Sequence, residues 1–169
     1  MGRLHHCAPV FGPSLRRKVA RVLRRQRVGM KPFSSESVGT AKAFRISPND
    51  TNYFALLFDG AKDGIDNVFV VEIFRHGGAT PPNTHSHAHE AFFVLHGEGI
   101  ARCGEHEVRL RKGDALLLRP GNEHVIENTG PGKLYTLTVM TPNEGFAELI
   151  RAGEPVALDA EDLSVLAGL

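Results

Sequence analysis

The chain has 169 residues, of which 41% are hydrophobic and 23% are charged. This length suits one domain, and it is enough to bury a core without disulfides or a structural metal. The composition excludes collagen, a coiled coil and a wholly disordered chain. No stretch approaches the roughly 20 apolar residues that a membrane-spanning helix needs.

The formal net charge of +1 hides an uneven distribution of charge along the chain. Residues 1–30 carry eight basic side chains and no acidic one, whereas residues 31–169 carry 12 basic and 19 acidic side chains, a net charge of −7. Within the basic segment, 14–26 has apolar residues at helical spacing with arginines on the opposite face. We interpret residues 1–30 as a basic tail that is disordered, or as a stretch upstream of a true start at Met30. The alternatives are a targeting segment and an arm for nucleic acid or membrane.

The two cysteines, Cys7 and Cys103, lie far apart in the sequence and do not suggest a disulfide framework. A reduced, cytoplasmic protein is the simplest interpretation. Cys103 is then a small apolar group in the core, and a reactive thiol is the alternative.

From residue 40 onward, short apolar or alternating runs are separated by Gly, Pro, Asn and Asp, a pattern typical of strands and turns. The predicted strands are Lys42–Ile46, Tyr53–Phe58, Asn67–Arg75, Glu90–His96, Gly99–Cys103, His106–Leu110, Ala115–Leu118, Glu123–Asn128 and Leu134–Met140. Two short helices are predicted near the end, over Asn143–Arg151 and Asp159–Leu166. This succession predicts an all-β sandwich or barrel with short C-terminal helices.

Histidines are concentrated in one part of the chain. Four lie within twelve residues: His85, His87, His89 and His96. On an extended segment, residues i and i+2 point to the same side, so His85 and His87 could converge on one point inside a barrel. With Glu90 and the distant His124 they would make a ligand shell for a first-row transition metal. The alternative is a histidine-rich loop that only faces solvent.

Two motifs surround these residues. The first comprises Gly78, His85-Ser86-His87, Glu90 and Gly97, and the second comprises Gly113, Gly121, His124 and Asn128. In this order they resemble the two sequence motifs of the cupin superfamily, and the match spans residues 78–128. The resemblance implies a single cupin domain over 31–169, folded as a double-stranded β-helix, or jelly roll.

The resemblance also implies a divalent transition metal held by His85, His87, Glu90 and His124. Imidazole and carboxylate ligands suit Fe, Mn, Ni, Co or Zn, and the sequence does not choose among them. Only two residues separate His87 from Glu90, one fewer than the family usually has, so His89 could replace or supplement Glu90. Arg119 stands where the family commonly has proline, and Pro120 fills the next position.

Strand alternation places Phe92 and Val94 on the same side as Glu90, and Ile126 and Asn128 on the same side as His124. We therefore expect these four residues to line a pocket beside the metal; simple packing in the barrel core is the alternative.

The functional hypothesis is a metal-dependent enzyme acting on a small organic substrate. Dioxygenation of an aromatic or enol-like molecule is the first choice of reaction, and isomerase or lyase chemistry follows. Glu90 would carry a proton as the catalytic residue. The alternative is a non-catalytic cupin that binds a small molecule. We expect no nucleic-acid or membrane partner, and we expect a homodimer that protects an exposed sheet edge.

Overall fold

The computed structural model describes residues 32–168. The basic segment 1–30, the helix expected over 14–26 and Cys7 lie outside the described residues. By its internal contacts the chain divides into residues 1–34 and 35–169, and all described strands and helices belong to the second unit. Within residues 32–168, no helix is long and apolar enough to cross a membrane.

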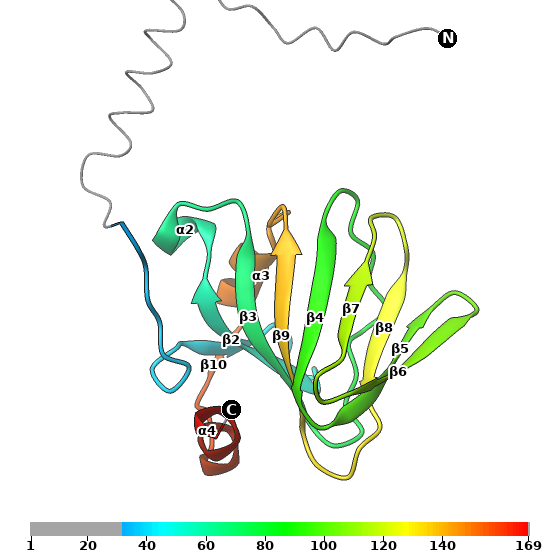
Figure 1. Cartoon of the computed structure of the whole chain (residues 1–169). Coiled ribbons are helices and arrows are strands. Elements are labelled where there is room, and N and C mark those ends of the chain that lie inside the picture. The colour runs from blue at the N-terminus through cyan, green and yellow to red at the C-terminus, as the bar shows by residue number, and fades with distance from the viewer. Residues whose placement is uncertain (1–31, 169) are drawn as a thin grey trace, which may run out of the picture. The chain divides into compact units, whose positions relative to one another are not determined.

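The described residues contain ten strands and three helices. The strands are β1 (Ala43–Arg45), β2 (Asn52–Phe58), β3 (Val68–Phe74), β4 (His89–His96), β5 (Glu98–Cys103), β6 (His106–Arg111), β7 (Ala115–Leu118), β8 (His124–Asn128), β9 (Leu134–Thr141) and β10 (Glu154–Val156). The helices are α2 (Gly60–Asp63), α3 (Phe146–Ala152) and α4 (Ala160–Ala167). A seven-stranded sheet has the order β10-β1-β2-β3-β9-β4-β7, and a three-stranded sheet has the order β6-β5-β8 (Figure 1). All strand pairs are antiparallel. This is the predicted jelly roll, so the all-β prediction is confirmed.

Each of the nine predicted strands is present within one residue of its predicted ends. The sequence did not predict β10, because Pro155 and its neighbours form a strand only through pairing with β1. It also did not predict α2, where the side chain of Asp59 caps the helix by accepting from the N–H groups of Ala61 and Lys62. The turn between β4 and β5 requires glycine, because Gly97 has a φ of +84° and a Cβ there would lie 2.6 Å from a backbone oxygen.

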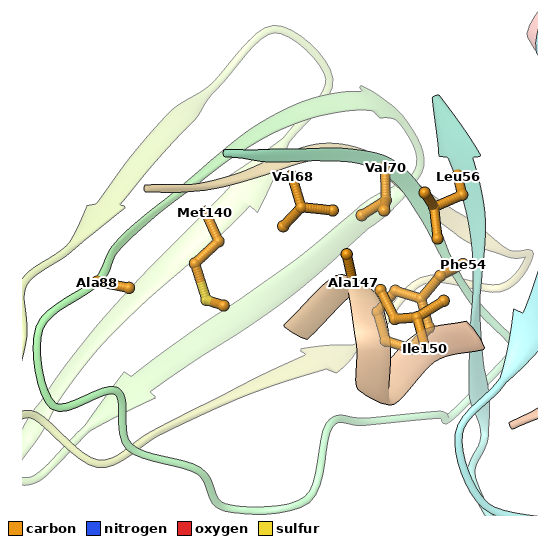
Figure 2. Close-up of a cluster of buried hydrophobic side chains, with 8 residues drawn as sticks. All are labelled: Phe54, Leu56, Val68, Val70, Ala88, Met140, Ala147 and Ile150. Carbon is orange, nitrogen blue, oxygen red and sulfur yellow. The ribbon is translucent and has the colours of Figure 1, made fainter. Parts of the chain in front are cut away.

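One end of the inner face of the large sheet is an apolar cluster beneath α3. Figure 2 shows α3 presenting Ala147 and Ile150 to Phe54 of β2 and Val70 of β3. The ring of Phe146 packs edge-to-face on Phe54, with ring centroids 5.5 Å apart. The helix thus closes this end of the barrel.

The other end of the inner face packs against the small sheet. The second apolar cluster contains Phe74, Phe92, Val94, Ala101, Leu110, Leu118, Ile126 and Leu134. These residues come from both sheets, in the way that the two inner faces of a β-sandwich interdigitate.

Polar side chains separate the two apolar clusters. Along β3, Glu72 lies between Val70 of the first cluster and Phe74 of the second, and every one of these side chains is buried. Along β9, Thr136 and Thr138 occupy the same level. A buried polar layer inside an apolar barrel lowers stability unless its groups form hydrogen bonds or bind a ligand. Such a layer is therefore a candidate position for a functional site.

The outer face of the large sheet is covered in part by α4, which a buried carboxylate joins to the sheet. Asp162 accepts hydrogen bonds from the hydroxyls of Tyr53 (2.9 Å) and Tyr135 (3.0 Å) and from the ammonium of Lys133 (2.8 Å). The same carboxylate forms a capping box with Asp159 at the start of α4.

Candidate metal centre

Three side chains from distant parts of the sequence meet inside the barrel. The Nε2 atom of His85 lies 3.2 Å from Glu90 Oε2, and the Nε2 atom of His124 lies 3.0 Å from the same oxygen. The three potential ligand atoms all lie within 4.8 Å of one another. Glu90 and His124 are buried, and His85 is half-buried. Among residues 32–168, this is the one group of three or more His, Cys, Asp or Glu side chains whose geometry could hold a metal ion.

The backbone fixes the relative position of these side chains. Glu90 is the second residue of β4 and points inward, and His124 is the first residue of β8. His85 lies in the β3–β4 loop, where its carbonyl accepts from the N–H of Gly121 at 2.7 Å. Asn83 and His124 exchange two backbone hydrogen bonds, of 3.2 and 3.0 Å. The two motifs are therefore joined by main-chain bonds on both sides of the cluster.

The His124 ring is oriented by a hydrogen bond behind it. Its Nδ1 lies 3.0 Å from the carbonyl oxygen of Asn122 and donates to it, and its Nε2 faces Glu90, to which it donates when the ring is protonated. Burial raises the pKa of Glu90, but the hydrogen bonds from His124 and His85 outweigh burial and bring that pKa below its ordinary value. Burial likewise lowers the pKa of His124, and the bonds to Glu90 and Asn122 outweigh it and raise that pKa.

A cavity of about 170 Å³ opens beside the cluster. It is lined by Ile46, Asp50, Asn52, Phe54, Glu72, Thr80, Pro81, Asn83, His85, Glu90, Phe92, Phe146 and Leu149. A cavity of roughly 150 Å³ holds a benzene molecule, so this space suits a molecule of about one six-membered ring. Its wall is largely apolar with a few convergent polar groups, which is typical of small-molecule sites.

Glu72 forms part of the polar wall of this cavity. Its carboxyl is fully buried and accepts from the amide of Asn52 (2.7 Å) and from the hydroxyl of Thr138 (3.2 Å). No cation lies within ion-pair distance of it among the described residues. Burial, and then the nearby charge of Glu90, raise the pKa of Glu72 to about 8. The cavity therefore contains a carboxyl group whose burial favours the protonated form.

The other three histidines of the four between His85 and His96 lie outside the site, and His96, the last residue of β4, is exposed. Residues 86 and 87 form a bend rather than extended chain, so His87 is exposed and does not follow the alternation expected from a strand. The backbone N–H of His87 donates to Glu144 Oε1 at 2.9 Å, which holds this bend. His89 begins β4 and is exposed, because it alternates with the inward-facing Glu90. The short spacing before Glu90 thus leaves one histidine of the first motif in the site, His85.

Of the four residues expected in the pocket, Phe92 lines the cavity. Val94 and Ile126 point inward as the alternation indicates, but they lie deeper, in the apolar cluster between the sheets. Asn128 is buried at the end of β8, where its amide donates to the carbonyls of Arg75 and Gly132, both at 2.8 Å. Its side chain fixes the turns at that end of the barrel.

Sequence reasoning did not single out Asn52, Glu72 and Asn83, which all line the cavity. Glu72 had a signal, because it is the single charged residue within the apolar run VFVVEIF. Asn83 had one as well, since it precedes His85 by two residues, the same spacing that drew attention to His87. Nothing in the sequence around Asn52 distinguishes it from an ordinary turn residue.

The donor set of the cluster fits a divalent transition metal. Two imidazoles and one carboxylate are the ligands that mononuclear iron and related sites use, with coordination positions left for other molecules. The hydrogen bond between His124 and the Asn122 carbonyl is the outer contact that metal-ligating histidines usually make. His85, Glu90 and His124 would hold the ion.

Comparisons with known proteins agree with the fold. The family model described as a cupin domain matches residues 70–140. Among solved structures, a predicted oxalate decarboxylase from Thermotoga maritima is 24% identical with a TM-score of 0.57, covering 64% of this chain and 97% of that chain. An uncharacterised protein with a double-stranded β-helix domain from Klebsiella pneumoniae is 22% identical with a TM-score of 0.53, covering 67% and 91%. A structure of oxalate oxidase is 21% identical with a TM-score of 0.57, covering 70% and 64%. No curated protein matches the chain significantly in sequence.

Proposed function

Since the chain belongs to the cupin superfamily, we propose that it binds one divalent transition metal and acts on a small organic substrate in the adjoining cavity. The observation that carries this proposal is the convergence of His85 Nε2 and His124 Nε2 on Glu90 Oε2. Two imidazole nitrogens and one carboxylate oxygen lie within 4.8 Å of one another at the edge of a partly open, mostly apolar cavity.

The residues of this chain have separate tasks in the proposed site. His85, Glu90 and His124 hold the ion, and the Asn122 carbonyl keeps the His124 ring in the tautomer that offers Nε2. Phe54, Phe92 and Phe146 surround the substrate and exclude water, which strengthens electrostatic contacts inside the cavity. When bound, the metal supplies Lewis acidity and, in the case of iron, a redox couple for chemistry with O₂.

Glu90 and Glu72 divide the acid–base work. Glu90 is held as a carboxylate by its two histidine partners, so the oxygen that does not hold the ion can take a proton from a substrate. Glu72 is neutral and buried in the same cavity, so it can donate a hydrogen bond to a substrate oxygen without repelling an anion. Two carboxyl groups with opposite pKa shifts in one cavity are typical of catalytic sites.

O₂-dependent oxidation is the reaction class that the donor set supports best, because two histidines and one carboxylate are the ligands of many non-haem iron oxygenases. The substrate would be a small molecule that chelates through oxygen. Two of the proteins similar in fold bear oxalate decarboxylase or oxalate oxidase in their names, which agrees with a small oxygen-rich acid. A binding module without catalysis is the second candidate, and it would use the same cavity.

Metal binding can be tested on the full chain purified without a histidine tag. We expect Mn²⁺, Fe²⁺, Co²⁺ or Zn²⁺ to raise the melting temperature of the wild type, since a ligand at 100 times its Kd stabilises by about 2.7 kcal/mol. His124→Ala should abolish this stabilisation. His87→Ala, which removes an exposed histidine of the same loop, is the matched control and should retain it. Stabilisation of His124→Ala equal to that of the wild type would contradict the proposed site.

Turnover separates the two candidate functions. The metal-loaded enzyme should consume O₂ with a small chelating acid, and Glu90→Gln should lose this activity. A binding module would show melting shifts with the same acids and no product.

Two expectations from the sequence stay predictions: a homodimer and a cytoplasmic location. Light scattering at high protein concentration tests the first, and cell fractionation tests the second.

A further inference from the structure

Asn83 is a polar residue of the cavity whose side-chain oxygen has no partner. The Oδ1 atom of Asn83 is buried and has no hydrogen-bond donor within reach among the described residues. Burying an amide oxygen without a hydrogen bond destabilises the folded protein, so a buried oxygen in this state indicates that a bound group uses it.

The backbone places Asn83 next to the three residues of the metal centre. Its main chain bridges to His124 through two hydrogen bonds, and it precedes His85 by two residues. Thr84, between them, is exposed, whereas Asn83 and His85 are both half-buried and both line the cavity with Glu90. Asn83 and His85 therefore share the inward side of this segment.

We infer that the Oδ1 atom of Asn83 is a fourth protein ligand to the metal of the proposed site, beside His85, Glu90 and His124. This inference rests on the proposed function, because it assumes that the ion is bound. An amide oxygen is a neutral, hard donor of the kind found at Ca²⁺, Mg²⁺ and Mn²⁺ sites. Exchanging such a donor for an imidazole would favour Zn²⁺ or Ni²⁺, so Asn83 would also tune the choice of metal toward Mn²⁺ and Fe²⁺.

Asn83→Leu is the sharpest substitution, since leucine has nearly the same volume but no donor atom. The backbone bonds to His124 do not involve the side chain and remain. We expect the Kd for Mn²⁺, measured by calorimetry, to rise at least 10- to 100-fold, which is the loss seen when even an outer contact of a metal ligand is removed. Asn83→Asp keeps an oxygen donor and should bind Mn²⁺ at least as tightly as the wild type. Asn49→Leu, at an exposed turn outside the cavity, is the matched control.

Selectivity between metals provides a second measurement, which would not change if Asn83 had a purely structural role. In Asn83→His, the ratio of the Zn²⁺ affinity to the Mn²⁺ affinity should rise about tenfold or more, because imidazole suits zinc better than manganese. A direct signature is available by NMR. The side-chain amide signals of Asn83, identified by their loss in Asn83→Leu, should shift when Zn²⁺ is added to the wild type.

The result that overturns the inference is equally specific. If Asn83 is only an unsatisfied buried amide, then Asn83→Leu is as stable as the apo wild type or more so, it binds Mn²⁺ within about twofold of the wild type, and the amide signals do not move. Failure of the proposed function would give a different result. In that case the wild type would bind no metal, and metal would have the same effect on the melting temperatures of the wild type and of His124→Ala.

Discussion

The buried carboxyl of Glu72 gives the folded protein a measurable dependence on pH. Glu72 lies between two apolar clusters, accepts from two neutral donors and has a pKa raised from 4.5 to about 8, first by burial and then by the charge of Glu90. Between these two pH values the native state keeps a proton on Glu72 that the unfolded chain has lost. The stabilisation of the native state by the protonated Glu72 is therefore complete below about pH 4.5, and it is lost as the pH rises to about 8.

The size of this effect follows from the same two values. One proton retained by the native state changes the folding equilibrium about tenfold per pH unit, and the whole interval corresponds to roughly 5 kcal/mol. Glu72→Gln removes the titration and preserves the shape, since the glutamine amide can bond both Asn52 and Thr138. We expect the substituted protein to match the wild type near pH 4 and to be more stable by several kcal/mol near pH 8.

The assay is urea unfolding of both proteins at a series of pH values, with a chelator present so that no dication acts on Glu90. Each protein gives a curve of the free energy of unfolding against pH. The difference between the two curves cancels the titration of the groups that both proteins share. Glu105→Gln, in the exposed turn between β5 and β6, is the control and should run parallel to the wild type. Parallel curves for Glu72→Gln and the wild type would contradict this prediction, because Glu72 would then be ionised equally in the folded and unfolded states.

Other predictions concern the helix that packs on the outer face. Asp162→Ala should destabilise the protein by about 3–5 kcal/mol, because it leaves the buried Tyr53 and Tyr135 hydroxyls unpaired, and the melting temperature should fall by roughly 10–15 °C. Glu161→Ala, on the exposed side of the same turn, should change stability by less than about 0.5 kcal/mol, and an equal loss in both variants would contradict this account. Burial and the bond to Asp162 raise the pKa of Tyr53, so stability should fall as the pH rises above about 10, as chemical unfolding at alkaline pH would show. A mass of one chain by light scattering would contradict the expected homodimer.

The first sequence motif shows both the reach and the limit of the sequence-based prediction. Glu90 and His124 stand at the starts of strands, where alternation predicts the direction of a side chain, and the structure brings both together with His85. His87 and His89 have the same chemistry, yet the structure leaves both exposed. Whether the chain between His85 and Glu90 is extended or bent depends on Glu144, 57 residues farther along, whose carboxylate holds the His87 N–H. No local pattern contains that contact.

The sequence is enough to predict the class of fold, nearly all strand boundaries and the residue types of the candidate site, because alternation, turn residues and motif spacing are local properties of the chain. Which of these side chains face one another depends on the tertiary structure. The cavity is made by β2, β3, β4, the β3–β4 loop and α3 together, so the roles of Asn52, Glu72 and Asn83 arise from burial. Burial is a property of the whole barrel: it raises the pKa of a glutamate within an apolar strand, and it leaves the side-chain oxygen of Asn83 without a hydrogen-bond partner among the described residues.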